Sequence, residues 1–339
     1  MAVPFRELVA EQRMNLPVLA TPKLCSGKVY IVTGANTGLG LEAARHVVAA
    51  EASKVILAVR NVSAGNAAKA DIESTTKSRD VVEVWQLDLA SYDSVKAFAK
   101  KVTENLDRLD CLIENAGVAL DKWVLAEGHE STIAINVMGT LLLGVLLFPK
   151  LVESARRYDI SPRLVLVTSE AGFTVRPEFD KIRDDPLAKM DDQKTADIGS
   201  RYQLSKLVQN MALRHLATLL PVSRTGVVIN AVNPGLCKTQ LSRNVRLTMR
   251  IVITLANSLL GRSVEMGSRT LVHAAVAGKE SHGCYLGACE IKENQVPSWA
   301  IDEEGKQDQK RIWDDIAKEL EKVAPGCVER MLSAAATQQ

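Results

Sequence analysis

The feature that most constrains the fold of this chain is a glycine-rich turn between a short apolar run and a helical pattern. Residues 28–33 form a strand-like run, the turn spans residues 33–40, and residues 41–51 have helical periodicity. Glycines in such a turn let the backbone approach a pyrophosphate, and the following helix begins with free N–H groups and a positive dipole end. The turn alone is a weak signal, since glycine turns also serve packing. Between a strand and a helix it indicates a dinucleotide-binding unit.

The alternation of strands and helices continues along the chain and defines its fold class. Further strands are expected at 54–59, 81–87, 111–113, 163–167 and 227–232, and helices at 64–76, 91–105, 131–158 and 201–219. Such alternation implies right-handed βαβ units, and solid apolar strands are typical of a sheet that is covered on both faces. We therefore expect an α/β fold with a doubly wound parallel sheet, in a single domain with extensions at both ends.

Polar side chains follow several of these strands, at the edge where ligands bind such sheets. Val59 stands where a carboxylate would accept the ribose 2′-OH of NAD, and Arg60 after it offers a planar fork for the 2′-phosphate of NADP. Asp88 can accept from an adenine amino group, or else cap the helix that begins near Ser91. The small residues at 115–117 offer a platform where a ribose passes closely. These positions predict NADP(H) as cofactor.

Tyr202 and Lys206, four residues apart on a predicted helix, indicate the chemistry. They share one helix face, so the ammonium can lie beneath the ring and lower the pKa of the phenol from its usual value of about 10 toward working pH. Such a tyrosine gives a proton to a carbonyl oxygen while a hydride reaches the carbon. Ser169 is placed to donate to the same oxygen, unless it only caps a loop. Asn136, inside an apolar helix, is predicted to relay protons to Lys206 through buried water, or else to mark a kink.

Composition argues against several other classes of function. Of the 339 residues, 42 are basic, 40 are acidic and only 4% are aromatic, so neither charge nor stacking rings support nucleic-acid binding. The six cysteines and five histidines are dispersed, without the spacing of a metal site, and we expect no metal and reduced thiols. The apolar stretches are shorter than the roughly 18 residues of a membrane span, and residues 1–7 lack the apolar core of a secretory signal. We expect a cytoplasmic location.

Together these motifs resemble the short-chain dehydrogenase/reductase family, in the NADP-preferring group close to retinol dehydrogenases. The matching features occur in family order between residues 27 and 240: the turn at 33–40, Arg60, Asp88, 115–117, Asn136, Ser169, Tyr202 with Lys206, and the run 234–239. The resemblance implies a Rossmann-type sheet and a catalytic tetrad of Asn136, Ser169, Tyr202 and Lys206. It also implies that Lys206 bonds the nicotinamide ribose, and that Leu236 and Thr239 hold the carboxamide end.

The cofactor contacts that we expect extend along the whole sheet edge. Besides Tyr202 and Lys206, they are Gly34, Thr37, Gly38, Leu39, Gly40, Arg60, Asp88, Leu89, Asn115, Pro234, Leu236 and Thr239. A narrower likeness, to fungal reductases of secondary-metabolite pathways, rests on the wording Leu-Ile-Glu-Asn-Ala-Gly, the N-terminal arm and the segment 311–314.

Two features depart from the family pattern. The family commonly has the motif Asn-Asn-Ala-Gly, and Glu114 occupies the first position of that motif here. A carboxyl at this position must find hydrogen-bond donors or hold a proton. Ser169 and Tyr202 lie 33 positions apart, more than the usual spacing. The charged segment 173–200 between them is predicted to be a lid or an ordered surface insertion.

We divide the chain into an N-terminal helical arm (1–26), a catalytic domain (27–300) and a C-terminal helical extension (301–339). Within the domain, the segment 241–262 is expected to cover the cleft, which favours a bulky, largely apolar substrate. Packing onto the core is the plainer interpretation of this segment. Shallow membrane contact through 243–260, which has arginines nearby, is a third one.

The leading functional interpretation is an NADPH-dependent reductase that interconverts a carbonyl and an alcohol, with Tyr202 as general acid/base. Alternatives are an NADP-dependent alcohol dehydrogenase of retinoid- or steroid-like substrates, and a cofactor-binding scaffold without turnover. The complete tetrad argues against the scaffold. The apolar helices at 131–158 and 201–219 predict a homodimer, unless the terminal arms cover them and leave a monomer.

Overall fold

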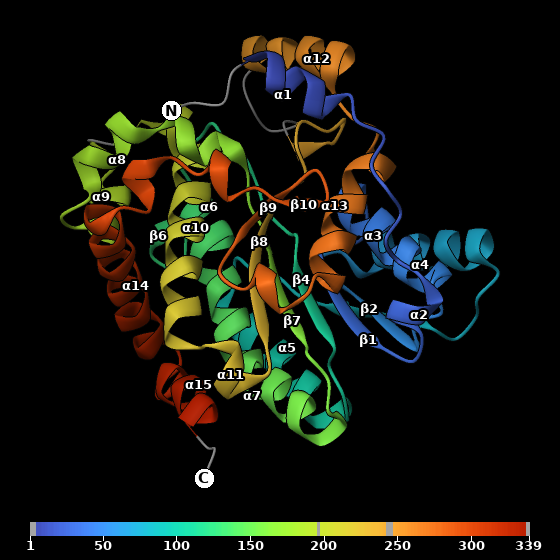
Figure 1. Cartoon of the computed structure of the whole chain (residues 1–339). Coiled ribbons are helices and arrows are strands. Elements are labelled where there is room, and N and C mark those ends of the chain that lie inside the picture. Colours follow the sequence, from blue (N-terminus) through green and yellow to red (C-terminus); the bar gives the residue numbers. More distant parts are fainter. Residues whose placement is uncertain (1–4, 195–196, 242–246, 337–339) are drawn as a thin grey trace.

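The computed structural model describes residues 5–194, 197–241 and 247–336, with one eight-stranded sheet at its centre (Figure 1). The strand order is β10 (Glu290–Ile291), β9 (Tyr285–Gly287), β8 (Val228–Asn233), β7 (Arg163–Val167), β4 (Cys111–Glu114), β1 (Val29–Thr33), β2 (Lys54–Val59) and β3 (Val82–Gln86). Neighbouring strands are parallel except β9 and β10. The chain runs outward from β1 to β3 and then returns to β4, so the topological switch lies between β1 and β4. The predicted doubly wound sheet is confirmed.

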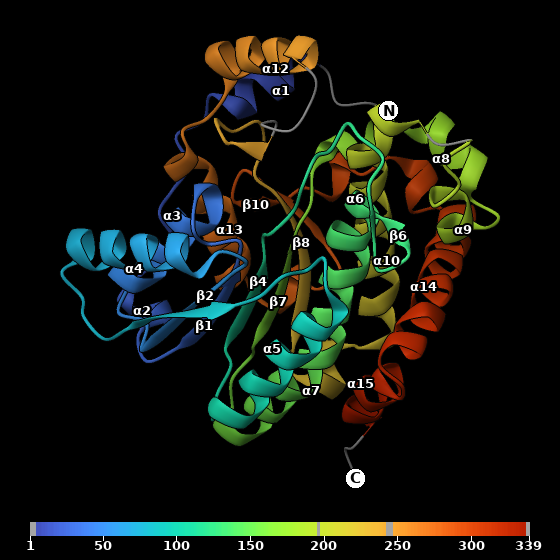
Figure 2. The same ribbon diagram turned by 180° about the vertical axis from the view of Figure 1, so that it is seen from behind.

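Alternate side chains of the strands enter two cores, one on each face of the sheet. Ile31 and Ile56 point into the core beneath α5 (Tyr92–Asn105), α7 (Thr140–Tyr158) and α10 (Arg201–Leu219). Tyr30 and Val32 point into the opposite core, beneath α3 (Gly38–Ala49), α4 (Val62–Thr76) and α13 (Val264–Val276). This period of two is the pattern of a strand that is buried on both faces. Figure 2 shows the two helical layers on either side of the sheet.

The element boundaries follow the predicted ones closely, with two informative differences. The strands at 54–59 and 163–167 and the helix at 201–219 have the predicted bounds. The helix expected from residue 41 already begins at Gly38, so the glycine turn supplies its first residues. The helix expected at 131–158 is interrupted near its start: after α6 (Ser131–Ile133) comes a π-helical segment, η1 (Ala134–Gly139), and then α7.

The segments α6, η1 and α7 follow one another without a break. Together they form the one described helical stretch, Ser131–Tyr158, that is long and apolar enough to cross a membrane. In its most apolar 18-residue stretch, 89% is buried inside the fold. Its side chains pack between the sheet and neighbouring helices, so its apolar character is that of a core helix.

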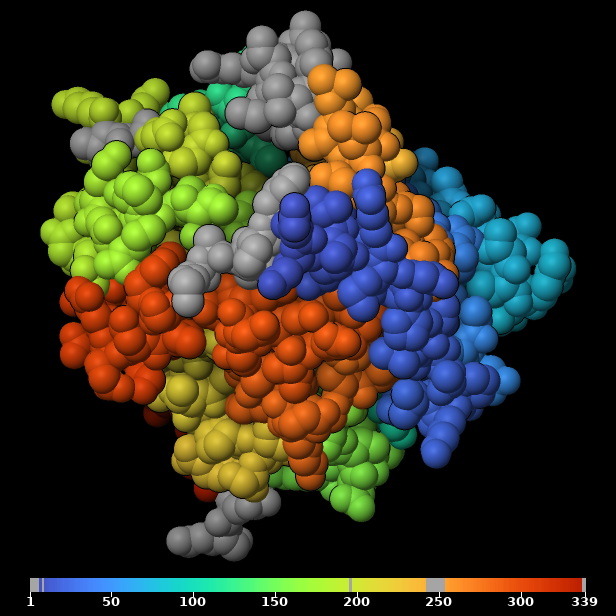
Figure 3. Space-filling view, turned by 45° about the horizontal axis from the view of Figure 1, so that its top comes forward, coloured from blue at the N-terminus to red at the C-terminus, as the bar shows by residue number. Residues whose placement is uncertain are grey.

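The N-terminal arm is anchored on the C-terminal part of the chain. Its helices are α1 (Phe5–Gln12) and α2 (Pro22–Cys25), and α1 lies beside α12 (Leu247–Leu260) in both ribbon views (Figures 1 and 2). The Gln295 side chain donates a 2.7 Å hydrogen bond to Glu11. Figure 3 shows the blue arm lying against the orange surface of this later segment. In the segment predicted to contact a membrane, Arg243 and Arg246 lie outside the described residues, while Leu259 is 80% exposed.

The insertion at 173–200, of which residues 173–194 and 197–200 are described, forms a surface layer of short helices. It contains η2 (Glu170–Thr174) at its start, α8 (Arg176–Ile182), α9 (Pro186–Met190) and η3 (Ile198–Ser200). Phe179 is fully buried and stacks on Trp299, with 6.1 Å between the ring centroids. Arg183 donates a 2.6 Å hydrogen bond to the buried carboxylate of Asp308. These contacts attach the insertion to Trp299, just before the C-terminal extension, and to Asp308 within it.

The C-terminal extension covers the helices that were expected to form a dimer interface. Its helices α14 (Glu303–Val323) and α15 (Cys327–Ala336) pack on α10 and α7, respectively. Ile312, Trp313 and Ile316 of α14 belong to the same core as α10. The homodimer was predicted because these faces looked too apolar to meet water, and the extension removes that reason.

We therefore expect a monomer in solution. Sedimentation equilibrium of the full chain should fit one chain mass at every protein concentration. Deleting residues 327–339 uncovers part of α7, and this variant should self-associate with rising concentration because buried apolar surface becomes exposed. A full-length chain that sediments as a stable dimer would contradict the expectation.

Candidate active site

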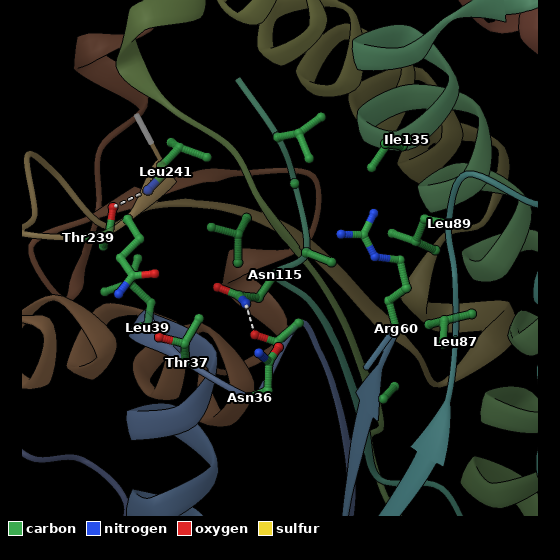
Figure 4. A pocket seen from close by; sticks show the side chains of 18 of the residues that line it. Asn36, Thr37, Leu39, Arg60, Leu87, Leu89, Asn115, Ile135, Thr239 and Leu241 are labelled. Atoms are coloured by element: carbon green, nitrogen blue, oxygen red, sulfur yellow. Dashed lines mark hydrogen bonds between the residues drawn. The ribbon is translucent and has the colours of Figure 1, made fainter. Parts of the chain in front are cut away.

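A cavity of about 410 Å³ lies at the carboxyl ends of the parallel strands, across the switch between β1 and β4. This volume is in the range of small-molecule sites. Most of the predicted site residues line it, namely Gly34, Thr37, Gly38, Leu39, Arg60, Asp88, Leu89, Asn115, Tyr202, Lys206, Pro234 and Thr239. Ten of the lining residues are labelled in Figure 4, among them Arg60, Asn115 and Thr239.

The glycine turn after β1 is held closely against the segment that follows β4. Gly34 has a φ of +65°, which favours glycine, and a side chain on Gly40 would come within 2.5 Å of the Asn115 amide nitrogen. That amide donates a 2.8 Å hydrogen bond to the carbonyl of Thr33, and the Thr33 hydroxyl accepts from Ala116 N at 2.9 Å. Gly40 thus serves this packing, whereas Gly34 and Gly38 line the cavity.

The N-terminus of α3 opens onto the same cavity. Thr37 occupies its N-cap position, and its hydroxyl makes no capping hydrogen bond within the described part of the chain. The first N–H groups of a helix lack intrahelical partners, and the positive end of the helix dipole favours an anion there. With Gly38 and Leu39 beside it, this terminus can bind the phosphates of a dinucleotide.

Arg60 leaves the end of β2 and extends into the cavity (Figure 4). The preceding Val59 is buried in the core and offers no acceptor to a ribose. Asn61, which follows, accepts from Ala64 N at 3.0 Å and caps α4. The strand end therefore presents a cation, and not a carboxylate, to this part of the cavity.

Asp88 follows β3 and lines the cavity, and two local hydrogen bonds hold it, one through its backbone and one through its side chain. Its N–H donates to the Ser94 hydroxyl at 2.9 Å, and its carboxylate accepts from Ala90 N at 3.0 Å. Ser91, and not Asp88, occupies the N-cap of α5. The capping alternative for Asp88 is therefore wrong, and its second carboxylate oxygen can accept from a ligand.

Tyr202, which lines the cavity, meets Ser169, although 33 positions separate them in the sequence. Ser169 itself is not among the described residues that line the cavity. Ser169 lies two residues after the end of β7 and caps η2, where its hydroxyl accepts from Ala171 N at 3.2 Å. It also hydrogen-bonds the Tyr202 hydroxyl. The close approach needs Gly172, since a side chain there would come within 2.7 Å of Leu207 N on α10. Ser169 is thus both a cap and a partner of the tyrosine.

The predicted electrostatics of the tyrosine–lysine pair are wrong for this structure. Burial raises the pKa of Tyr202 to about 12, and the hydrogen bond with Ser169 opposes that rise. Burial also lowers the pKa of Lys206 to about 7. The Lys206 nitrogen lies 5.9 Å from the centre of the tyrosine ring and donates instead to the Val167 carbonyl at 2.9 Å. Tyr202 therefore keeps its proton at neutral pH, as a proton donor must.

Asn136 and Lys206 are joined by a side chain that the sequence analysis missed. Gln209, one turn after Lys206 on α10, accepts from the Lys206 ammonium at 2.9 Å and donates to the backbone carbonyl of Asn136. The Asn136 side chain is occupied elsewhere, with hydrogen bonds to both backbone groups of Val118 and to Ser205. A glutamine three positions after a catalytic lysine could have been noticed from helical spacing alone.

The turn after β8 contributes Pro234 and Thr239 to the cavity, but Leu236 is not among the described residues that line it. Both backbone groups of Leu236 are bonded to the Gln12 side chain of the N-terminal arm. The predicted contact of Leu236 with a carboxamide is therefore not available in this arrangement. Gln12 was missed because a partner 224 positions away leaves no local pattern.

Among the described residues, no group of three or more His, Cys, Asp and Glu side chains could hold a metal ion.

Apolar and small residues form another part of the cavity wall. Val118, Ile135 and Leu241 make part of the wall apolar. Gly117 lies where a side chain would come within 3.2 Å of the Asn136 carboxamide oxygen, so the small-residue platform also gives Lys206 its room.

A doubly wound sheet with a glycine turn, a helix N-terminus and a tyrosine–lysine pair on one cavity defines a dinucleotide-binding oxidoreductase. The sequence model for short chain dehydrogenases matches residues 28–180. A short chain dehydrogenase/reductase of Cryptosporiopsis sp. is 42% identical over 305 residues, which are 89% of this chain and 93% of that protein. A short chain dehydrogenase of Emericella nidulans is 45% identical over 269 residues, 76% and 83% of the two chains. The chain belongs to the short-chain dehydrogenase/reductase family.

Solved structures share this fold at low sequence identity. An NADPH-bound carbonyl reductase from chicken fatty liver has a TM-score of 0.58 at 22% identity and covers 81% of this chain and 100% of its own. A short chain dehydrogenase from Shigella flexneri, complexed with NADP, has a TM-score of 0.57 at 20% identity, with 80% and 100% covered.

Proposed function

We propose that this protein is an NADPH-dependent reductase that converts a carbonyl group of a bulky, largely apolar small molecule to an alcohol. The observation that carries the proposal is the pair of Tyr202 and Lys206 on the wall of the same cavity as the glycine turn. Membership of the family and the NADPH-bound carbonyl reductase among the structural neighbours support it. The apolar wall and the likeness to fungal pathway reductases favour an intermediate of secondary metabolism as substrate.

The cavity fits NADP(H) on three structural grounds. The N-terminus of α3 has its Thr37 cap position open to the cavity, Gly38 has open space where a side chain would stand, and Arg60 presents a cation. In our proposal, the α3 terminus holds the pyrophosphate, Arg60 the 2′-phosphate and Asp88 the adenine, while Lys206 holds the ribose next to the nicotinamide. The bound cofactor supplies the hydride.

The chain's own residues provide the proton and the orientation. Tyr202 is protonated at neutral pH, so its hydroxyl can donate to the carbonyl oxygen of the substrate as charge develops there. Ser169, already bonded to that hydroxyl, fixes its direction and offers a second donor. We propose reduction as the direction because it requires a protonated tyrosine, the form that burial of Tyr202 favours.

Arg60→Ala should shift the cofactor preference toward NAD(H). A charge-assisted hydrogen bond contributes on the order of 1.5–3 kcal/mol, so the ratio of the NADPH and NADH dissociation constants should change by at least about tenfold. Fluorescence titration of both cofactors measures it. Arg60→Lys is the matched control, because it keeps the charge but loses the planar fork, and it should have an intermediate ratio. An unchanged ratio in Arg60→Ala would remove Arg60 from 2′-phosphate recognition.

The function is tested by NADPH consumption with a panel of bulky apolar ketones and aldehydes, analysed for alcohol products. We expect turnover with members of this panel, and none with small hydrophilic carbonyls of equal reactivity. If the enzyme instead oxidises apolar alcohols with NADP and leaves every carbonyl unreduced, the direction we propose is wrong. Tight NADPH binding without turnover in either direction would favour the scaffold.

A further inference from the structure

Gln209 is a fully buried amide at the centre of the reaction site, and both ends of its side chain are occupied. It lies on α10 one turn after Lys206 and is 1% exposed. Its side-chain carbonyl accepts from the Lys206 ammonium at 2.9 Å, and its amide nitrogen donates to the backbone carbonyl of Asn136. One side chain therefore links the lysine of α10 to the π-helical segment η1.

The orientation of this amide is fixed by its neighbours. A backbone carbonyl can only accept and an ammonium can only donate, so the nitrogen must face Asn136 and the oxygen must face Lys206. The carbonyl of Asn136 lies in a π-helical turn, where backbone pairing is displaced by one residue and a carbonyl can accept from a side chain. The Asn136 side chain cannot take this role, because Val118 and Ser205 occupy it.

We propose that Gln209 is a positioning residue for the reaction, which holds the Lys206 ammonium through its side-chain oxygen and is itself anchored on Asn136. The inference rests on the proposed function, in which Lys206 holds the ribose next to the nicotinamide. Within the described part of the chain, Lys206 has two acceptors, the Gln209 side chain and the Val167 carbonyl, each at 2.9 Å. Only Gln209 is a side chain, so it is the acceptor that substitution can remove.

The charge of Lys206 depends on this acceptor because the site is buried. Burial disfavours the ammonium and lowers the pKa of Lys206 to about 7. An acceptor favours the charged form, so loss of Gln209 should lower this pKa further and a carboxylate in its place should raise it. The titratable group nearest to Lys206 on its own helix is Tyr202, and on η2 it is Glu170, whose side chain accepts from Asn233. Asp88 and Arg60 line the same cavity from β3 and β2.

The test compares Gln209→Met, which removes the acceptor at similar volume, with Gln209→Glu, which makes it anionic. The NADPH dissociation constant is measured by fluorescence from pH 5.5 to 9.5, and kcat/KM for NADPH over the same range. In the wild type both should worsen as Lys206 loses its proton. The pH at which this happens should fall by about one unit in Gln209→Met and rise by about one unit or more in Gln209→Glu.

Asn210→Leu is the control, since it also removes a buried amide from α10, at the next position. It should leave the transition where the wild type has it. A loss of packing alone would move all three variants in one direction or none of them. Opposite shifts support the inference, whereas equal or absent shifts in the two Gln209 variants overturn it. If Gln209→Met does not fold, the upward shift in Gln209→Glu decides alone.

The outcome is separable from the proposed function. An inactive Tyr202→Phe together with wild-type pH profiles in the Gln209 variants would refute the role of Gln209 and leave the reductase standing. A fully active Tyr202→Phe would refute the proposed chemistry, whatever the Gln209 variants do.

Discussion

Tyr202→Phe is expected to lower turnover by about 10²-fold or more, the usual scale for a positioned general acid. The variant loses only the hydroxyl that faces Ser169, so the fold and the affinity for NADPH should be retained. Because burial holds the pKa of Tyr202 at about 12, the wild-type residue stays protonated throughout the neutral range. Single-turnover reduction with saturating NADPH, measured with an accepted substrate, separates the chemical step from product release.

Tyr92→Phe is the matched control for this experiment. The Tyr92 hydroxyl is buried in α5 and finds no hydrogen-bond partner among the described residues. Its removal should leave turnover at the wild-type level. Near-normal turnover in Tyr202→Phe would show that other groups protonate the substrate.

Glu114→Gln is expected to stabilise the protein, by an amount that grows as the pH rises. Glu114 ends β4 with its carboxyl facing α7, where it receives a hydrogen bond from the Gly144 N–H. One carboxyl oxygen finds no partner among the described residues, and burial raises the pKa of Glu114 well above its ordinary value. Burial therefore favours the protonated form of the Glu114 carboxyl. Protonation was one of the two outcomes predicted for a carboxyl at this position.

The sign follows from proton binding. Between the ordinary pKa and the raised one, the folded state keeps the proton that the unfolded state releases, so stability is fully present at low pH and is lost as the pH rises. The loss approaches about 1.4 kcal/mol per pH unit. Urea unfolding at pH 5.5 and 7.5 should therefore show a larger advantage of Glu114→Gln at the higher pH.

Glu83→Gln on β3 provides the control with the opposite electrostatics. Hydrogen bonds from Lys54 and Trp85 lower the pKa of Glu83, so both states are ionised throughout this pH range. Its effect on stability should be the same at pH 5.5 and 7.5. Parallel pH dependences for Glu114→Gln and the wild type would mean that Glu114 is ionised in the fold.

The sequence alone predicts the sheet and most of the site because both depend on local patterns. The strands that were predicted are largely apolar runs, and the site residues follow a strand or lie on a helix face, so the sheet edge brings Arg60, Asp88 and Tyr202 together. The edge strands β9 and β10 are only three and two residues long and were not predicted. The same reasoning fails where burial decides. Helical spacing places Lys206 beside Tyr202, but it does not show that both groups are desolvated, which reverses the predicted pKa of the phenol.

Contacts between distant parts of the chain could not be predicted from the sequence either. The packing of α14 on α10 leaves no sign in the local sequence pattern. An apolar helix face has the same pattern whether it packs on another chain or on the C-terminal part of the same chain. Gln209 is an intermediate case. Its spacing from Lys206 was visible, but its role depends on the π-helical carbonyl of Asn136 across the helix interface.

The bond between Gln12 and Leu236 also sets an order of events during synthesis. The N-terminal arm leaves the ribosome before its partner, which lies 224 positions further along the chain. The contact that Gln12 makes with Leu236 therefore cannot form until β8 and the turn after it have been translated. Contacts of such long sequence separation form slowly. A nascent chain halted before that turn would carry α1 undocked, so this early-made helix would be among the last elements to join the fold.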